Sequence, residues 1–275
     1  DEALMSGIVP GKPGTDKALT GGPGGNKPMT GVSVTGEISI IHAPSVEEPF
    51  LLVNNPSGLA SAPLREGDDS AVTRLLPDFP AIARERGRKA VEGGLVHRLD
   101  TQTSGLLLIA ASQDFYDHII AEQEAGKFIK TYTAVCDNAR SIPPAEGFPP
   151  RPPFAEQWAT GGRSYSLRVE SRFRPWGPHG REVRPVSESS GPGAVKKASP
   201  GLYRTELSLE PYEDGTVSAT CRIARGYRHQ VRCHLAWLGF PVKGDVLYNP
   251  AAKAGDALCF HATGLAFLGL SFSLY

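Results

Sequence analysis

The chain has 275 residues, of which 40% are hydrophobic, enough for one large domain or two small ones. Its 29 basic and 29 acidic residues give a formal net charge of zero, which argues against a protein that coats nucleic acid through bulk charge alone. No apolar run reaches the roughly 20 residues of a membrane-spanning helix, and the four cysteines are far apart with no C-x-x-C pair. We therefore expect a globular cytoplasmic protein with no membrane contact, no metal site and no disulfide framework.

The composition divides the chain into an arm and a domain. Residues 1–40 are rich in glycine, proline, lysine and threonine, with almost no periodic apolar pattern. Such a segment cannot offset the entropy lost on folding, so we predict a flexible arm over 1–40 and an ordered domain over 41–275. Within that domain, residues 138–200 are Pro-rich at the start and Gly/Ser-rich at the end, which predicts a surface insertion with one strand near 163–173.

Strands outnumber helices in the predicted domain. Order is predicted to begin near ISIIHAP and PFLLVNNPSGLASAPL, where an apolar run stopped by Asn-Pro and glycine predicts a strand leading into a loop. Apolar or alternating runs predict further strands over residues 104–111, 127–137 and 257–268, and a hairpin over 201–224. Helical spacing predicts helices over 112–126 and 229–239, whereas the helical pattern of 68–86 is broken by prolines. No βαβ rhythm or repeat is present. The pattern favours an α+β fold with a mixed, mainly antiparallel sheet and flanking helices.

Three ionisable residues lie directly before the predicted strand at 104–111. The stretch HRLDTQTSG begins at His97 and contains Arg98 and Asp100. A carboxylate at the edge of a core can be partly desolvated and oriented by neighbouring hydroxyls and amides, so Asp100 could be a nucleophile or a base. A capped turn built by Asp100, Thr103 and Ser104 is the simpler interpretation, and the spacing alone does not decide between them.

A second cluster of charge lies near the C-terminus. Between Cys221 and Asp245 there are five basic residues and no acidic ones, namely Arg222, Arg225, Arg228, Arg232 and Lys243. On the predicted helix, Val231 can face the core while Arg232 faces a neighbouring loop. Arg232 could therefore orient a buried aspartate through a bidentate pair, although a solvated basic face explains the same pattern.

Four motifs in order give the chain a family resemblance over about residues 48–270. HRLDTQTSG, KTYTAV, RHQVRCHLAWLGFPVKGDVLY and LCFHATGL together resemble the RluA-like RNA pseudouridine synthases. The resemblance implies the pseudouridine synthase catalytic fold and an isomerase that converts uridine in RNA to pseudouridine. It also implies that no metal or redox cofactor is required, and that the partner of the chain is RNA.

The resemblance assigns the reaction to Asp100, Tyr132 and Arg232. Asp100 matches the carboxylate that attacks the uridine, at the ribose C1′ or, in an older account, at the base. The glycosidic bond then breaks, the uracil turns and C5 rejoins C1′. Tyr132 matches a tyrosine that stacks on the uracil and helps to remove the C5 proton, and Arg232 matches an arginine that pairs with the aspartate. A core aromatic remains the structural alternative for Tyr132.

Further residues are implied in substrate binding. Arg98 matches the arginine that replaces the flipped base in the RNA stack. Leu258 is the favoured match for the apolar side chain under the uracil, with Phe260 as an equally spaced alternative on the same face of the strand. His97 is expected to be a structural partner beside the site. Thr103 and Arg228 are the remaining residues that we predict to take part in substrate binding. The chain departs from the family at Tyr227–Arg228, where Arg-Thr is usual, and at Asn55, where lysine is common.

The predicted insertion offers a separate hypothesis for RNA capture. Between residues 150 and 200 there are nine basic residues against four acidic ones, with Tyr165, Phe173 and Trp176 among them. This segment could bind phosphates and stack on bases. A solvated loop with aromatics packed underneath is an equal alternative.

Three functions remain open from the sequence. The first is a monomeric uridine-to-pseudouridine isomerase that acts on structured RNA, with ribosomal RNA preferred over tRNA. The second is a catalytically silent RNA-binding or assembly factor of the same fold. A hydrolase that uses Asp100 with His97 or His229 ranks lowest, because the chain lacks a glycine-flanked nucleophile turn and an ordered triad.

Overall fold

The computed structural model of this protein describes residues 9–10, 36–84, 87–152 and 164–274. Its strands are β1 (Val9–Pro10), β2 (Ser39–His42), β3 (Phe50–Asn55), β4 (Ser104–Ala110), β5 (Ile129–Cys136), β6 (Tyr165–Trp176), β7 (Glu182–Val186), β8 (Tyr203–Pro211), β9 (Val217–Ile223), β10 (Phe260–Phe267) and β11 (Leu270–Ser273). Its helices are α1 (Ala71–Leu75), α2 (Gln113–Glu124), α3 (Pro192–Lys196) and α4 (Gln230–Leu238), with short 3₁₀ turns η1 (Pro80–Ala83), η2 (Ala90–Glu92) and η4 (Pro178–Gly180).

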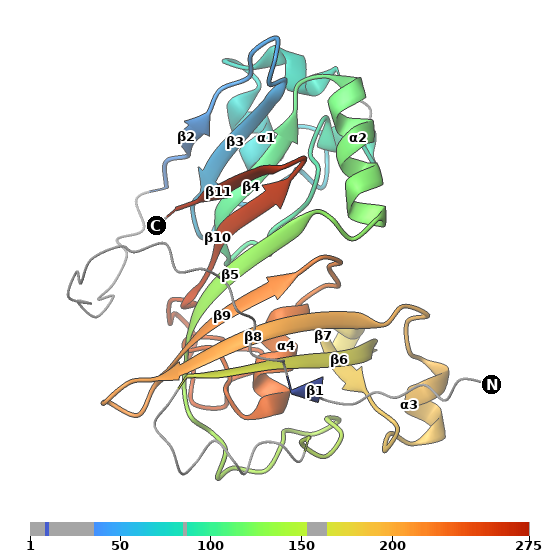
Figure 1. The fold of residues 1–275 in the computed structure, drawn as a ribbon, viewed down its shortest axis with the longest axis vertical. Helices are drawn as coiled ribbons and strands as arrows, with labels where there is room; N and C mark the ends of the chain where they lie inside the picture. The colour runs from blue at the N-terminus through green and yellow to red at the C-terminus, as the bar shows by residue number, and fades with distance from the viewer. Residues whose placement is uncertain (1–8, 11–35, 85–86, 153–163, 275) are drawn as a thin grey trace.

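One mixed sheet connects these elements. The strand order is β1-β6-β8-β9-β5-β10-β4-β3-β2, with β7 paired to β6 and β11 paired to β10. Among the described strands the pairing of β10 with β4 is parallel and the other pairings are antiparallel. The predicted α+β class with a mainly antiparallel sheet is therefore confirmed. In Figure 1, β2, β3 and β4 lie in the upper half, β6, β8 and β9 lie in the lower half, and β5 runs between them.

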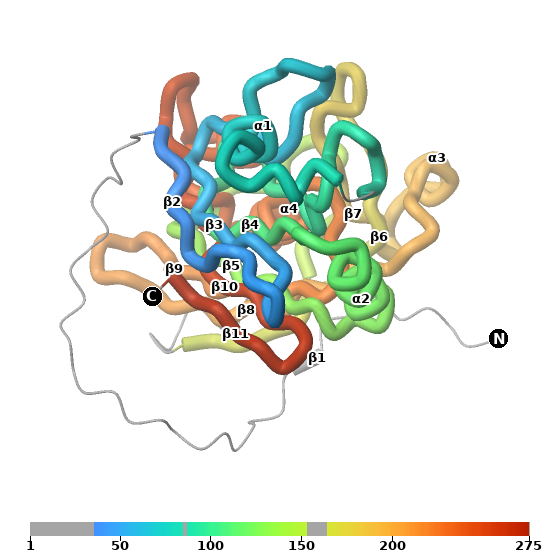
Figure 2. Tube along the Cα trace, turned by 90° about the horizontal axis from the view of Figure 1, so that it is seen from above, coloured from blue at the N-terminus to red at the C-terminus, as the bar shows by residue number. Residues whose placement is uncertain are grey.

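Both faces of the β3–β4 pair are buried. Successive side chains of a strand point to opposite faces, so Leu51 and Val53 join one apolar cluster while Phe50 and Leu52 join another. The first cluster includes α1 and α4, and the second includes α2. Figure 2 shows α1 and α2 on different sides of β3 and β4. Burial on two faces explains why these strands read as continuous apolar runs in the sequence.

The predicted helices and hairpin form as expected. Ser112 caps α2 by accepting a hydrogen bond from the Phe115 backbone N–H, and Gly239 ends α4 with a left-handed φ of 90°. The 201–224 hairpin forms as β8 and β9. The helical pattern of 68–86 is interrupted as predicted, because α1 ends at Leu75 and a 3₁₀ turn begins at Pro80. No helix in the described part of the chain is both long and apolar enough to cross a membrane.

The described part of segment 138–200 is built into the sheet. Strand β6 pairs with β8 along seven residues, and the Pro-containing β7, which the sequence pattern did not predict, pairs with β6. The Phe173 side chain is fully buried, and the Arg174 guanidinium lies 4.4 Å from the centre of the Trp176 ring. This packing favours internal roles for these aromatics. The arm over 1–40 lies mostly outside the described residues, and the predicted domain and insertion boundaries stay predictions.

The loop that carries Asp100 is anchored where β4 meets β10. Ser104 and Gly105 pair with His261 and Ala262 in the parallel ladder. Gly105 has a φ of +123°, and a Cβ atom at this position would lie 2.2 Å from the Ala262 carbonyl oxygen. Glycine is therefore required here, both for its backbone conformation and for the close approach of the two strands.

Replacing Gly105 with alanine should destabilise the protein by about 3 kcal/mol, because the new Cβ meets backbone atoms that cannot turn aside. Urea unfolding followed by circular dichroism measures this free energy. Gly191→Ala is the matched control: a Cβ atom at Gly191 would have no heavy atom within 4 Å, and the φ of −63° is an ordinary one, so this substitution should leave stability nearly unchanged. Equal stability of the two variants would contradict the prediction.

Candidate active site

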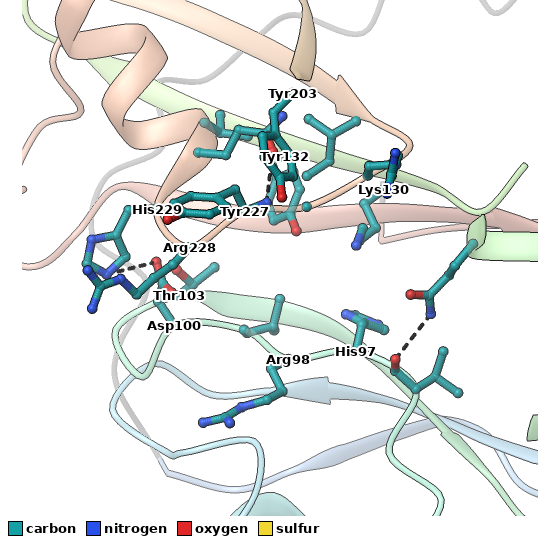
Figure 3. Close-up of a pocket in the computed structure, with 18 of the residues that line it drawn as sticks. His97, Arg98, Asp100, Thr103, Lys130, Tyr132, Tyr203, Tyr227, Arg228 and His229 are labelled. Atoms are coloured by element: carbon teal, nitrogen blue, oxygen red, sulfur yellow. Dashed lines mark hydrogen bonds and ion pairs between the residues drawn. The ribbon is translucent and has the colours of Figure 1, made fainter. Parts of the chain in front are cut away.

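A cleft of about 800 Å³ lies between the Asp100 loop and the 223–232 segment, with β5 along one wall. Figure 3 shows two facing walls. One wall carries Lys130, Tyr132 and Tyr227, and the other carries His97, Arg98 and Asp100. Polar, charged and aromatic groups from several separate parts of the chain line the cleft.

Arg232 lies between two carboxylates at one end of the cleft. Its Nε and one terminal nitrogen donate to the two carboxylate oxygens of Asp245, each at 2.7 Å, and its other terminal nitrogen donates to Asp100 Oδ2 at 3.0 Å. The Arg232 side chain is 3% exposed and that of Asp245 is fully buried, whereas that of Asp100 is 29% exposed. The bidentate pair predicted for Arg232 is therefore made with Asp245, and Asp100 receives a single charged hydrogen bond.

The charge of Arg232 is secured by this arrangement. Burial by itself opposes a charged guanidinium, but hydrogen bonds and charges from Asp245 and Asp100 outweigh it and raise the pKa of Arg232 above its ordinary value. One permanent positive charge is thus shared by two carboxylates. Asp100 is the one that can exchange a protein contact for a ligand, because it faces the cleft.

A third group approaches the Asp100 carboxylate from the start of α4. His229 has a left-handed φ of 56°, and its Nε2 lies 3.8 Å from Asp100 Oδ2. Its Nδ1 is hydrogen-bonded to the Tyr248 hydroxyl at 2.9 Å, and that hydroxyl accepts the Val183 backbone N–H at 3.0 Å. Burial lowers the pKa of His229, although the charge of Asp100 acts in the opposite direction. A neutral imidazole therefore lies beside the carboxylate at neutral pH.

Tyr132 and Phe260 form a stacked and largely buried aromatic pair that lines the cleft. Their ring centres are 5.1 Å apart with an interplanar angle of 5°, so the rings are stacked. The rings lie on neighbouring strands, β5 and β10. Burial, followed by the negative charge of Asp100, raises the pKa of Tyr132 above its ordinary value. At neutral pH the side chain is therefore a phenol.

The Asp100 loop is also held from behind. The Ser61 hydroxyl accepts the Leu99 backbone N–H at 2.9 Å, and the Gly58 backbone N–H donates to the Thr101 carbonyl at 2.7 Å. Asn55 supports this neighbouring loop, because its side-chain amide donates to the Leu59 carbonyl at 3.0 Å. Asn55 is fully buried, so the residue that departs from the family pattern has a structural role beneath the site.

Comparison with known proteins gives this geometry a context. The family model described as RNA pseudouridylate synthase matches residues 49–237. The chain belongs to this family. It is 24% identical over 231 residues to the ribosomal large subunit pseudouridine synthase D of Zymomonas mobilis, covering 81% of this chain and 63% of that protein. It is 27% identical over 221 residues to the dual-specificity RNA pseudouridine synthase RluA of Escherichia coli, covering 78% of this chain and 81% of that protein.

Solved structures agree at the level of the fold. Human RNA pseudouridylate synthase domain containing 1 superposes with a TM-score of 0.59 at 18% identity, covering 90% of this chain and 85% of that one. Human RNA pseudouridylate synthase domain containing 4 superposes with a TM-score of 0.56 at 18% identity, covering 86% of this chain and 88% of that one. The chain spans 63% of the Zymomonas mobilis relative and 51% of a Xylella fastidiosa pseudouridine synthase D, so it matches only part of those proteins.

The residues that the pseudouridine synthase resemblance singled out lie mostly around this cleft. Asp100, Tyr132 and Arg232 all line it, as do His97, Arg98, Thr103, Arg228 and Phe260. Of the two apolar candidates, Phe260 lines the cleft, and Leu258 is packed in the core cluster without being among the described lining residues. Their parts in catalysis and substrate binding stay predictions.

The individual contacts sharpen several of these expectations. Arg98 is half-exposed and donates to Glu92 Oε1 at 3.4 Å, so its side chain is available to the cleft. The Thr103 backbone N–H donates to the Asp100 carbonyl at 2.8 Å, which makes the predicted turn, and its buried hydroxyl has no partner among the described residues. The Asp100 loop therefore contains both the predicted turn and a partly exposed Asp100 carboxylate.

His97 and Arg228 are held by the protein itself. His97 Nε2 accepts the Leu108 backbone N–H at 3.2 Å, and burial, followed by the charge of Lys130, lowers the pKa of His97 to about 3. This neutral ring agrees with a structural role. Arg228 donates to the Gly180 carbonyl and, at 3.1 Å, to the Glu182 carbonyl, so its guanidinium ties the cleft rim to the start of β7.

The sequence reasoning missed two groups in the site. In the sequence, Asp245 only marks the end of a basic stretch, in the motif GDVLY, yet in the structure it is the main partner of Arg232. A lone acidic residue after a long basic segment was the available signal. Lys130 was treated only as part of a strand motif, yet it is buried in the wall of the cleft.

Replacing Asp245 with asparagine should cost about 3 kcal/mol of folding free energy, because it leaves the buried Arg232 without its bidentate partner. Asp100→Asn is the matched comparison: that carboxylate is partly exposed and shares Arg232, so the expected cost is below about 1 kcal/mol. Chemical unfolding of both variants gives the two values. A smaller cost for Asp245→Asn than for Asp100→Asn would contradict this account of the pair.

Proposed function

We propose that this chain isomerises uridine to pseudouridine in structured RNA, with Asp100 as the nucleophile. The observation that carries the proposal is the Asp100 carboxylate, which faces the cleft and is held by one nitrogen of a guanidinium whose other nitrogens are bound to Asp245. The family membership supports the reaction class. The chain would require RNA as its partner and no redox or metal cofactor.

In the proposed reaction, a uridine is flipped out of the RNA and enters the cleft. The Asp100 carboxylate attacks C1′ of the ribose, the C1′–N1 bond breaks, and the electron pair of that bond leaves with the uracil. The uracil turns in place, C5 bonds to C1′, and the bond between C1′ and the carboxylate breaks. The C5 proton is then lost and N1 gains a proton, so the product is an isomer of the substrate. The hydrogen bond from Arg232 holds the carboxylate in position during these steps.

The aromatic pair would hold the uracil while it turns. Tyr132 offers a ring for stacking and a hydroxyl close enough to Asp100 for that charge to affect its pKa. Because this side chain is a phenol at neutral pH, it can accept the C5 proton only by passing its own proton to another group. The Asp100 carboxylate, free again after C5 has bonded to C1′, is the acceptor that we propose. Asp100 then releases this proton to water and N1 takes a proton from water, so both side chains return to their starting states.

Ribosomal RNA is the proposed substrate ahead of tRNA. The Zymomonas mobilis relative is named for the ribosomal large subunit, while the Escherichia coli relative is named for dual specificity. We also propose that the chain acts as a monomer in the cytoplasm.

Asp100→Asn should abolish isomerisation, with a loss of more than about 10⁴-fold, because the amide cannot attack C1′. Release of tritium from RNA transcribed with [5-³H]uridine measures the reaction, since the C5 hydrogen leaves in it. RNA binding by the variant, measured by filter retention, should stay within about threefold of wild type. Wild-type protein that binds ribosomal RNA but releases no tritium would overturn the proposal and favour the silent RNA-binding factor.

Tyr132→Phe should separate binding from turnover. The phenylalanine ring keeps the stacking surface with Phe260 but has no hydroxyl, so we expect RNA affinity near that of wild type and a tritium-release rate lower by at least about 100-fold. Phe260→Leu provides the contrast, because it removes the stacked ring and leaves the hydroxyl, and it should weaken RNA binding instead. Full activity of Tyr132→Phe would exclude the proposed proton transfer.

A further inference from the structure

Lys130 is a buried cation in the wall of the cleft. It lies two residues before Tyr132 on β5, and the alternating burial of that strand places both side chains on the same face. The residue is 8% exposed and lines the cleft. Its amine therefore belongs to the same cavity as the aromatic pair, about 6.6 Å further along the strand.

No acidic side chain among the described residues pairs with Lys130, nor does the described chain give its amine a hydrogen bond. The Phe128 ring lies 5.6 Å from Nζ. Burial, followed by the positive charge of Arg88, lowers the pKa of Lys130 to about 8. The side chain is buried, yet Nζ is not among the enclosed atoms without a partner, so the amine opens onto the cleft. An anionic ligand in the cleft is therefore the group that would pair with it.

The surroundings of Lys130 leave room for such a ligand. A Cβ atom at Gly226 would lie 3.2 Å from Lys130 Nζ, so a glycine here lets the backbone pack close to one side of the amine, while the residue also lines the cleft. Figure 3 shows Lys130 and His97 on opposite walls of the cleft. His97 is neutral, and the acidic Glu92 of the same cleft is paired with Arg98. Neither group therefore supplies a negative charge to Lys130.

We propose that Lys130 binds a phosphate of the RNA strand next to the target uridine. This inference rests on the proposed function only for the identity of the nucleotide. Lys130 on β5 would hold the backbone while Tyr132, on the same face of that strand, stacks on the base. The two contacts would fix the nucleotide at its phosphate and at its base, and leave the ribose to face Asp100.

The test compares two small probes, uridine and uridine 3′,5′-bisphosphate, whose binding to the intact protein is measured by NMR titration. Wild type should bind the bisphosphate at least about tenfold more tightly, the value of one good charge-assisted contact. Lys130→Met should lose most of that preference. Lys127→Met is the matched control, because Lys127 is exposed, lies 3.8 Å from Glu122 and does not line the cleft; it should keep the preference.

Stability separates a ligand site from a structural lysine. Replacing an unpaired buried ammonium with methionine should leave the urea midpoint unchanged or raise it, whereas a lysine that supports the fold would give a lower midpoint. If Lys130→Met does not fold, the ammonium resonance of Lys130 in the wild-type protein gives the answer, since it should shift with the bisphosphate and not with uridine. A full preference in folded Lys130→Met, or no shift in wild type, overturns the proposal.

The outcomes are distinguishable from a failure of the proposed reaction. Asp100→Asn should keep the phosphate preference, because Asp100 makes no contact with Lys130. A protein that prefers the bisphosphate through Lys130 but never forms pseudouridine would retain the phosphate site and lose the isomerase proposal. Conversely, a protein that forms pseudouridine with no effect of Lys130→Met on bisphosphate binding would lose only the phosphate site.

Discussion

The buried guanidinium of Arg232 is the interaction on which the site depends. Its three nitrogens join α4 to Asp245 on one side and to the Asp100 loop on the other. Since a buried charge without partners is unfavourable, the fold must bring these parts of the chain together in order to satisfy it. The same requirement that stabilises the C-terminal half therefore orients the carboxylate at the mouth of the cleft.

The two carboxylates differ in environment, and this difference separates structure from chemistry. Asp245 is fully enclosed and bidentate, so it serves the fold, while Asp100 is partly exposed and retains one oxygen outside the contact with Arg232. Two residues on one face of β5 also offer the cleft different kinds of group. Tyr132 contributes an aromatic surface, and Lys130 contributes a charge that no described residue neutralises.

Local patterns in the sequence predicted most elements, because Ser112, Gly239 and the alternating residues of β8 and β9 act over short distances. The family motifs also located the cleft. What the sequence could not supply were pairings set by tertiary contacts. The Arg232–Asp245 pair depends on how a loop folds back beneath α4. Strand β7 contains a proline, which is compatible with its place as an edge strand beside β6. The placement of Lys130 likewise depends on a tertiary contact, because Gly226 packs close to its Nζ.

The parallel pairing of β4 with β10 has a consequence for how the site is assembled during folding. The Ser104 hydroxyl and His261 Nδ1 are hydrogen-bonded at 2.5 Å although 157 positions separate them in the chain. Contacts of such high sequence separation incur a large loop-closure entropy and form slowly. The Asp100 loop is anchored at this junction and at Arg232. It therefore acquires its final geometry only after distant halves of the polypeptide have met, so the cleft is completed late in folding and not within any early local structure.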